Sequence, residues 1–282
     1  YLLIFVLFII FISKYFGSKS DSTASKTAEV FEKIELGTVS KYISATICLL
    51  IFIFVFCIPF IQLILWHFDN SDFELFEHLK LLLNSVTIGI FVALLTVFFA
   101  ISLALSYKKT RYLKPMISIS TSGYAIPGSV ISAGLLISFD LIFNTAITLY
   151  GILGLILCLS LRFMTPAFNY ISSSLANISK SSENALQTHP KNSYKAFINF
   201  YLPQIRPAIL LGIMIVFIES IKEQPATLLL RPVGFDTLST KVYNFTSEGQ
   251  WVMASSPSLL LILLSLIFVY LINKNIDLSK HN

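Results

Sequence analysis

Five long uncharged runs constrain what this chain can fold into. They are Tyr42–Trp66, Leu81–Tyr107, Pro115–Phe139, Leu141–Leu161 and Gly249–Asn273. Each is long enough to cross a hydrocarbon core about 30 Å thick, which takes about 20 residues of α-helix. Because that core has no water to bond the backbone N–H and C=O groups, each run is expected to be a transmembrane helix.

The composition agrees with a membrane protein. The chain is 55% hydrophobic and 12% charged, and its mean hydropathy is +0.79. A sixth expected span, Pro207–Leu230, is apolar except at its centre. Another apolar run, Tyr1–Ile12, has no basic residues ahead of it and no small-residue cleavage site behind it, so we do not interpret it as a signal peptide. We expect this run to be the end of a transmembrane helix that begins before Tyr1.

The basic residues predict the orientation of the chain. If segment 14–41 is cytoplasmic and the spans alternate, most of the 20 Lys and Arg residues fall on the cytoplasmic side, whereas the first outer loop, 67–80, is acidic. This distribution follows the positive-inside rule. The net charge of +5 is therefore attributed to topology and not to nucleic-acid binding. We expect a multi-pass membrane protein with the lipid bilayer as its surroundings.

No motif for enzyme chemistry stands out. The sequence lacks the GxxxxGK[ST] phosphate-binding loop, so this chain is not expected to bind ATP itself. The histidines have no metal-ligand spacing, and the cysteines lie within apolar runs, where they are expected to be small packing residues. The histidines are His67, His78, His189 and His281, and the cysteines are Cys48, Cys57 and Cys158.

A polar insert interrupts the apolar sequence before Pro207. Two serines precede Glu183 as candidate N-caps of a short helix, which Pro190 ends or kinks. A second short helix, 193–201, is predicted to have an apolar face and to be broken by Leu202-Pro203. Two interpretations stay open: the insert docks into a groove of a soluble partner, or it lies on the lipid headgroups.

The centre of the sixth span carries ionisable residues near the expected midplane of the membrane. Glu219, Lys222 and Glu223 are predicted to share one helical face, and Pro225 is predicted to break the helix just beyond them. Charges at this depth usually line a pathway or a watered cavity, and broken helices are common at transporter sites. A net-negative lining would suit a cation. The alternative is a structural ion pair that holds two helices together.

The polar insert resembles the cytoplasmic coupling loop of type I ABC importer permeases, which has the pattern E-A-A, then Gly, then L-P. Alignment on Leu-Pro places Asn-Ala-Leu at the E-A-A positions, an acidic residue just before them and Pro at the Gly position. The resemblance implies contact with the ATPase through Glu183, Asn184, Ala185, Leu186, Pro190, Leu202 and Pro203. The Pro changes the turn, because proline has a fixed φ and no N–H donor.

A second block narrows the resemblance to the iron(III)-type ABC permeases. It begins at Lys222 and reads KEQPATLLLRPVGFDTLSTKVY. Asn84-Ser85 and the sequence GYAIPG at 123–128 add to it, so the resemblance covers nearly the whole chain. Because members are commonly double-length chains with two six-span repeats, we interpret this chain as a C-terminal half.

The resemblance implies an all-α type I permease bundle of six transmembrane helices plus one preceding helix. Residues 1–16 would be the last helix of a preceding repeat and 17–41 a cytoplasmic linker. Residues 42–273 would be the transmembrane domain, with the coupling loop at 177–206, and 274–282 a cytoplasmic tail.

The implied function is ATP-driven import of ferric iron across the bacterial inner membrane. The expected partners are a dimer of ABC ATP-binding subunits, a periplasmic ferric-binding protein and the first-repeat half of the permease, in the same longer chain or as a second copy. ATP and magnesium would be bound by the partner subunit, and no cofactor by this chain. Glu219, Lys222, Glu223 and Tyr124 would line the pathway, with transient Fe3+ contact at the two glutamates, although packing is the alternative for Tyr124.

Two alternatives to this function stay open. The same architecture could import thiamine, a polyamine or a phosphonate. A proton-coupled secondary transporter that uses Glu219 as a relay is an alternative of a different class. The segment from Arg231 to Asp236 could contact a binding protein at the outer surface, or cap the span that ends at Leu230.

Overall fold

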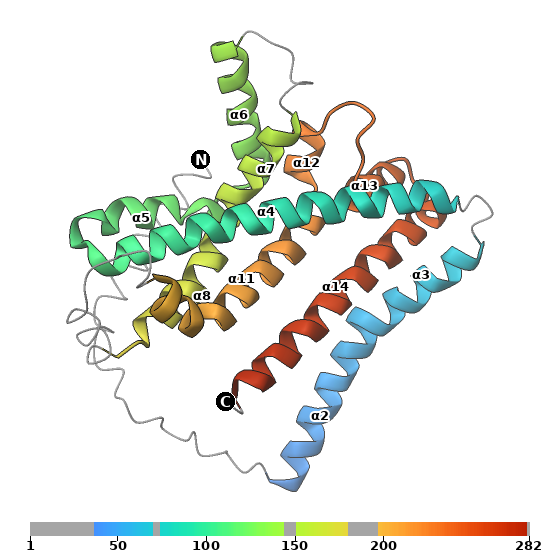
Figure 1. Ribbon diagram of the computed structural model, residues 1–282. Coiled ribbons are helices and arrows are strands. Elements are labelled where there is room, and N and C mark those ends of the chain that lie inside the picture. The colour runs from blue at the N-terminus through green and yellow to red at the C-terminus, as the bar shows by residue number, and fades with distance from the viewer. Residues whose placement is uncertain (1–36, 70–73, 144–150, 180–196, 281–282) are drawn as a thin grey trace. The chain divides into compact units, whose positions relative to one another are not determined.

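The computed structural model describes residues 37–69, 74–143, 151–179 and 197–280, and every regular element in these ranges is a helix (Figure 1). The elements are α2 (Thr38–Phe52), η1 (Ile53–Cys57), α3 (Ile58–Asp69), α4 (Leu75–Lys109), η2 (Arg111–Leu113), α5 (Lys114–Ser120), η3 (Gly123–Ala125), α6 (Gly128–Phe143), α7 (Gly151–Arg162), α8 (Met164–Ala176), η5 (Phe197–Tyr201), α11 (Leu202–Lys222), α12 (Pro225–Leu230), α13 (Leu238–Ser247) and α14 (Trp251–Lys280).

The chain divides into two compact units. The first ends at Gln62 and the second runs from Leu63 onward. Within the first unit, the described residues form an apolar helix that contains the π-helical turn η1. The predicted helix at 1–16 and most of the predicted linker lie outside the described residues. At the other end, α14 continues through Lys280, into the segment predicted to be a tail.

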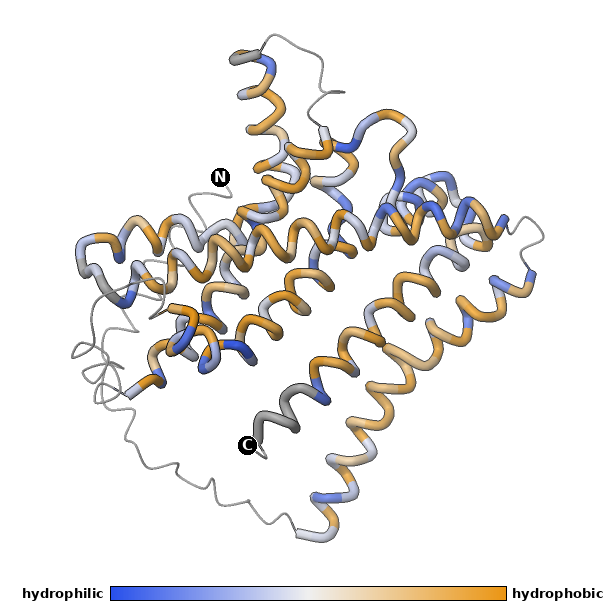
Figure 2. Tube along the Cα trace, in the orientation of Figure 1, coloured by the Kyte–Doolittle hydropathy of each residue, from blue (hydrophilic) through white to orange (hydrophobic). Residues whose placement is uncertain are grey.

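The number of spans agrees with the all-α, six-span prediction. Within the described residues, four helices are long and apolar enough to cross a membrane, and there are up to six spans if each of two bent helix pairs counts as one. The four are Thr38–Asp69, Leu75–Lys108, Phe197–Lys222 and Trp251–Lys274. Figure 2 shows the hydrophobic colouring along α4, α11 and α14, whereas α13 is largely hydrophilic.

Two predicted spans are not straight helices. In the third, the segments Lys114–Ala125 and Gly128–Leu141 meet at 111°. Ile126 and Pro127 lie between these two segments, so this span is not one continuous helix. The fourth lies later than the predicted Leu141–Leu161, because Gly151–Arg162 continues into Met164–Ala176 after a 47° bend. Arg162, expected at the cytoplasmic boundary, thus lies in the middle of a bent pair.

The prediction that Leu202-Pro203 breaks the helix is wrong. The π-helical turn η5 leads directly into α11, and Tyr201 between them has helical dihedral angles (φ −75°, ψ −47°). Proline is tolerated here because it lies in the first turn of α11, where the hydrogen-bond register changes from π to α and its missing N–H is least needed. The apolar helix already includes Phe197, so it does not begin at Pro207.

The core lies among α4, α8 and α11, which pack against one another. Small residues allow the close approach of these helices. At Gly89 of α4, an added Cβ would lie 2.8 Å from Cε2 of Phe217 on α11, so only glycine fits that contact. The largest fully buried side chains of this cluster include Val92, Leu159, Ile171, Ile205, Val216 and Phe217.

Candidate functional site at three helix breaks

The sixth predicted span breaks where its charges lie. Helix α11 ends at Lys222, Glu223 is extended (φ −71°, ψ 117°), and α12 starts at Pro225. The predicted break at Pro225 is therefore confirmed. Lys222 Nζ lies 3.0 Å from Glu219 Oε1, in a partly exposed pair on the last turn of α11. Glu223 lies past the helix end, so the prediction that all three residues share one helical face is wrong.

Glu223 is held by three other helices. Its Oε1 accepts a hydrogen bond from Arg162 Nη1 at 3.0 Å, and its side chain is only 8% exposed. Its backbone carbonyl accepts hydrogen bonds from the hydroxyls of Thr227 on α12, at 2.7 Å, and Ser239 on α13, at 3.2 Å. These contacts satisfy a carbonyl that the end of α11 leaves without a helical partner.

Gly128, the first residue of α6, provides the space for the ion pair. A Cβ at this position would lie 2.1 Å from Arg162 Nη1 and 2.3 Å from Glu223 Oε1. The start of α6, the end of α7 and the end of α11 thus meet at one place. Each is the break in a different apolar span, so we define the site as this junction of three breaks.

Tyr124 lies close to the junction. Its ring centroid is 6.3 Å from that of Phe163, whose ring also lies 5.7 Å from the guanidinium carbon of Arg162. The turn η3 that carries Tyr124 approaches the end of α7 closely, since a Cβ at Gly123 would lie 2.4 Å from the carbonyl oxygen of Leu161. Tyr124 is half exposed. The structure therefore brings Tyr124, Glu219, Lys222 and Glu223 to one region of the bundle.

The sequence predicts a net-negative lining, but Arg162 balances the charge of Glu223, so this prediction is wrong. Each of the two glutamates has a basic partner, Lys222 or Arg162, so the four formal charges cancel. Within the described ranges, no group of three or more His, Cys, Asp and Glu side chains could hold a metal ion. Arg162 is not among the site residues predicted from the sequence, because it directly follows the uncharged run that ends at Leu161 and is therefore expected at the membrane surface.

A second polar cluster joins α4 to the loop after α12. Asn84 Nδ2 donates a hydrogen bond to the carbonyl oxygen of Asp236 at 2.8 Å. The hydroxyl of Ser85 accepts one from the backbone N–H of Leu238, also at 2.8 Å. Arg231 forms an ion pair with Asp236 across the loop. The segments that carry the sequence resemblance, at 84–85 and 222–243, are therefore in direct contact.

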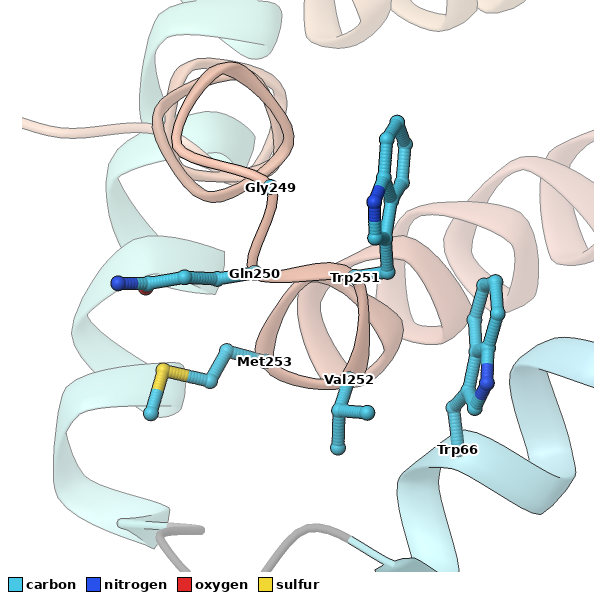
Figure 3. A pocket seen from close by; sticks show the side chains of 6 residues that line it. All are labelled: Trp66, Gly249, Gln250, Trp251, Val252 and Met253. Carbon is cyan, nitrogen blue, oxygen red and sulfur yellow. The ribbon is translucent and has the colours of Figure 1, made fainter.

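An apolar notch lies at the turn between α13 and α14. It has a volume of about 400 Å3 and is lined by Trp66, Gly249, Gln250, Trp251, Val252 and Met253 (Figure 3). Gly249 has a φ of 75°, which lets the chain reverse there without strain. Beside the notch, His67 Nδ1 lies 2.9 Å from Ser256 Oγ, which connects the end of α3 to α14.

The predicted ATPase-contact residues are only partly described. Leu202 and Pro203 lie in the first turn of α11. Glu183, Asn184, Ala185, Leu186 and Pro190 lie outside the described residues.

Comparison with solved structures shows the fold. The alginate ABC transporter, crystallised with an alginate-bound periplasmic protein, contains a chain that superposes with a TM-score of 0.58 at 16% identity, over 83% of this chain and 92% of that one. A second structure of a bacterial alginate importer gives the same TM-score over 86% of this chain. The chain therefore shares the fold of a chain in these alginate ABC transporters.

Sequence comparison defines the family. No family model matches the chain. The Fe(3+)-transport system permease protein FbpB 2 of Haemophilus influenzae is 32% identical over 231 residues, which are 79% of this chain and 45% of that protein. A ferric transport system permease of Actinobacillus pleuropneumoniae is 34% identical over 43% of this chain and 18% of its own length. The chain belongs to the ABC importer permeases, is similar over most of its length to members named for ferric transport, and is a multi-pass inner-membrane protein.

The chain spans less than half the length of these ferric permeases. A permease of Salmonella typhimurium named for 2-aminoethylphosphonate transport is 24% identical over 67% of this chain and 71% of its own length.

Proposed function

We propose that this chain is the membrane subunit of an ATP-driven importer that passes ferric iron from a periplasmic binding protein to the cytoplasm. The observation that carries the proposal is the 32% identity to a Haemophilus influenzae Fe(3+)-transport permease over 79% of this chain. The contact between Asn84-Ser85 and the loop at 236–238 supports it, because it gives the shared sequence blocks a common structural role.

The transport cycle depends on a partner that hydrolyses ATP. A dimer of ATP-binding subunits, which hold ATP and magnesium, closes and moves the insert that contains Ala185. This movement is transmitted to α11, since the insert precedes that helix in the chain. The helix breaks at Glu223 and Gly128 then change their separation and open the path to one side of the membrane at a time.

The cargo makes only brief contact with the permease. Glu219 is the first candidate for this contact, because its side chain is 30% exposed whereas that of Glu223 is buried. Fe3+ is a hard cation that favours carboxylate oxygens. With Lys222 beside it, Glu219 attracts the ion without holding it tightly, which suits a path that must also release its cargo.

A second cargo has a specific observation in its favour. The Salmonella typhimurium relative named for 2-aminoethylphosphonate transport covers 67% of this chain at 24% identity. Uptake of radiolabelled ferric iron into proteoliposomes, with the phosphonate, thiamine and a polyamine as competitors, separates these cargoes. Iron uptake that resists all three competitors supports the proposal, and inhibition by one of them assigns the cargo to that class.

Dependence on ATP is tested with the Ala185→Asp substitution. In vesicles that contain the ATPase subunits and the binding protein, this variant should insert normally, hydrolyse ATP and fail to couple hydrolysis to uptake. Ala24→Asp, the same change in the predicted linker, is the matched control and should transport normally. Full transport by Ala185→Asp contradicts the coupling role, and uptake driven by a proton gradient without any ATPase makes the chain a secondary transporter.

A further inference from the structure

The contacts around Glu223 single out one ion pair as the connection between the three helix breaks. Arg162, at the end of α7, reaches the carboxylate of Glu223 at 3.0 Å. Glu223 is in turn bonded through its backbone carbonyl to α12 and α13. Because Gly128 has no side chain, the start of α6 lies directly against this pair, and an added Cβ would clash with both members. Movement of any of these helix ends relative to the others therefore disturbs the pair.

The arginine in this pair is only partly satisfied. Arg162 Nε is buried and, among the described residues, has no hydrogen-bond partner. A buried ion pair is stabilising only when the remaining donors of its members are also bonded, and a partly satisfied pair is costly to maintain. A modest input of free energy can therefore convert this arrangement of the helix ends into a different one.

We propose that Arg162 is a positioning residue for transport, and that its ion pair with Glu223 holds the three helix breaks together until the partner's ATP hydrolysis separates them. The inference rests on the proposed function for its transport step. Its structural step, closure of the junction by the ion pair, stands independently and can be measured without cargo. The pair closes the path in the described conformation, and its rupture admits water to the ends of α7 and α11.

Cys158 is a native reporter for this closure. It lies one turn before Arg162 on α7 and is fully buried. Maleimide reacts with the thiolate, which forms only where water reaches the sulfur, so the labelling rate measures opening of the junction. The substitutions Cys48→Ser and Cys57→Ser remove the other two cysteines of the chain. The rate is then measured on the full chain in proteoliposomes.

Arg162→Gln and Gly128→Ala are expected to break the pair, whereas Arg162→Lys is expected to keep it. Arg162→Gln removes the charge, and we expect about tenfold faster labelling of Cys158, since the open state of such a junction is a minor population that can rise by that factor. Arg162→Lys keeps the charge and should stay close to the unmodified protein. Gly128→Ala keeps both charges but places a methyl group where the pair lies, and should also raise the rate.

Gly134→Ala is the matched control on the same helix. An added Cβ at Gly134 meets nothing within 4 Å, so this variant should label as slowly as the unmodified protein. Arg206→Gln, which removes an exposed charge from α11, is the corresponding control for charge. Thermal unfolding separates opening from loss of the fold. If Arg162→Gln does not fold, Gly128→Ala decides the result.

Transport and ATP hydrolysis are measured in vesicles that also contain the ATPase subunits and the ferric-binding protein. We expect Arg162→Gln and Gly128→Ala to hydrolyse ATP with few ions moved per ATP, whereas Gly134→Ala keeps the normal ratio. Slow labelling and a normal ratio in both junction variants overturn the proposal. If the unmodified protein moves no ferric iron but the labelling pattern is as expected, the proposed function fails and the closure of the junction stands.

Discussion

The hydroxyl of Ser85 on α4 accepts a hydrogen bond of 2.8 Å from the backbone N–H of Leu238, which is 153 residues away in the chain. Both residues are buried. Leu238 is the first residue of α13, where a helix has backbone N–H groups without helical partners. The capping box formed by Thr237 and Thr240 satisfies others of these groups, so Ser85 completes the cap from another helix.

Ser85→Ala should destabilise the protein because it leaves the N–H of Leu238 buried without an acceptor. We expect a loss of about 1–2 kcal/mol, the usual cost of a buried unsatisfied donor. Chemical denaturation of the purified protein in detergent measures it. The control is Ser102→Ala, which removes an exposed serine hydroxyl on the same helix that donates to the carbonyl oxygen of Phe98, and it should change little. Equal effects of the two substitutions would contradict the assigned cap.

Gly89→Ala should destabilise the packing of α4 against α11. The added Cβ would lie 2.8 Å from Phe217 and 2.9 Å from Ile221, so side chains in the core must shift, at a cost of about 1–3 kcal/mol. Gly212→Ala is the control on α11, because its Cβ would meet Val97 at 3.5 Å, an ordinary contact. Alanine favours helix over glycine by up to about 1 kcal/mol, so Gly212→Ala should be neutral or stabilising. Thermal unfolding compares the two, and greater loss at Gly212 would refute the packing described.

Lys241 on α13 and Glu77 on α4 form an ion pair of 2.6 Å at the acidic end of α4. Because both side chains are partly exposed, at 22% and 45%, the pair should contribute only about 0.2–1 kcal/mol. A double-mutant cycle with Lys241→Ala and Glu77→Ala measures the interaction free energy. It should decrease as salt is raised, since ions screen exposed charges. A coupling that is large and independent of salt would mean that the pair is buried in the membrane-embedded protein.

The notch beside α14 predicts where the tryptophans lie in the bilayer. The chain has two tryptophans, Trp66 and Trp251, and both line the notch (Figure 3). They stand near ends of the apolar spans Thr38–Asp69 and Trp251–Lys274. Tryptophan side chains favour the level of the headgroups.

Lipids that carry bromine near the headgroup should therefore quench the intrinsic fluorescence more strongly than lipids brominated near the chain end. The measurement uses the full chain in proteoliposomes of otherwise equal composition. The single substitutions Trp66→Phe and Trp251→Phe separate the two signals. Stronger quenching by chain-end bromine would place the notch in the membrane interior.

The spans were predictable because the membrane leaves the backbone few options. The apolar runs at 42–66 and 81–107 each fall within a long helix of the structure, and the run at 249–273 does so from Trp251 onward. The break at Pro225 was also predictable, since proline lacks the N–H that would continue the helix. The predicted break at Leu202-Pro203 was wrong because a π-helical turn precedes it, and the residue pattern does not show that change of register.

The sequence alone determined that this chain is a bundle of apolar helices with charges in one span. A bilayer requires internally bonded backbone, and hydropathy is a local property that each run displays by itself. Only the tertiary structure decided that Arg162, from another span, neutralises Glu223 beside Gly128. Which side chain lies opposite a buried charge depends on how the helices bend and pack, and that arrangement is set by contacts between residues far apart in the chain.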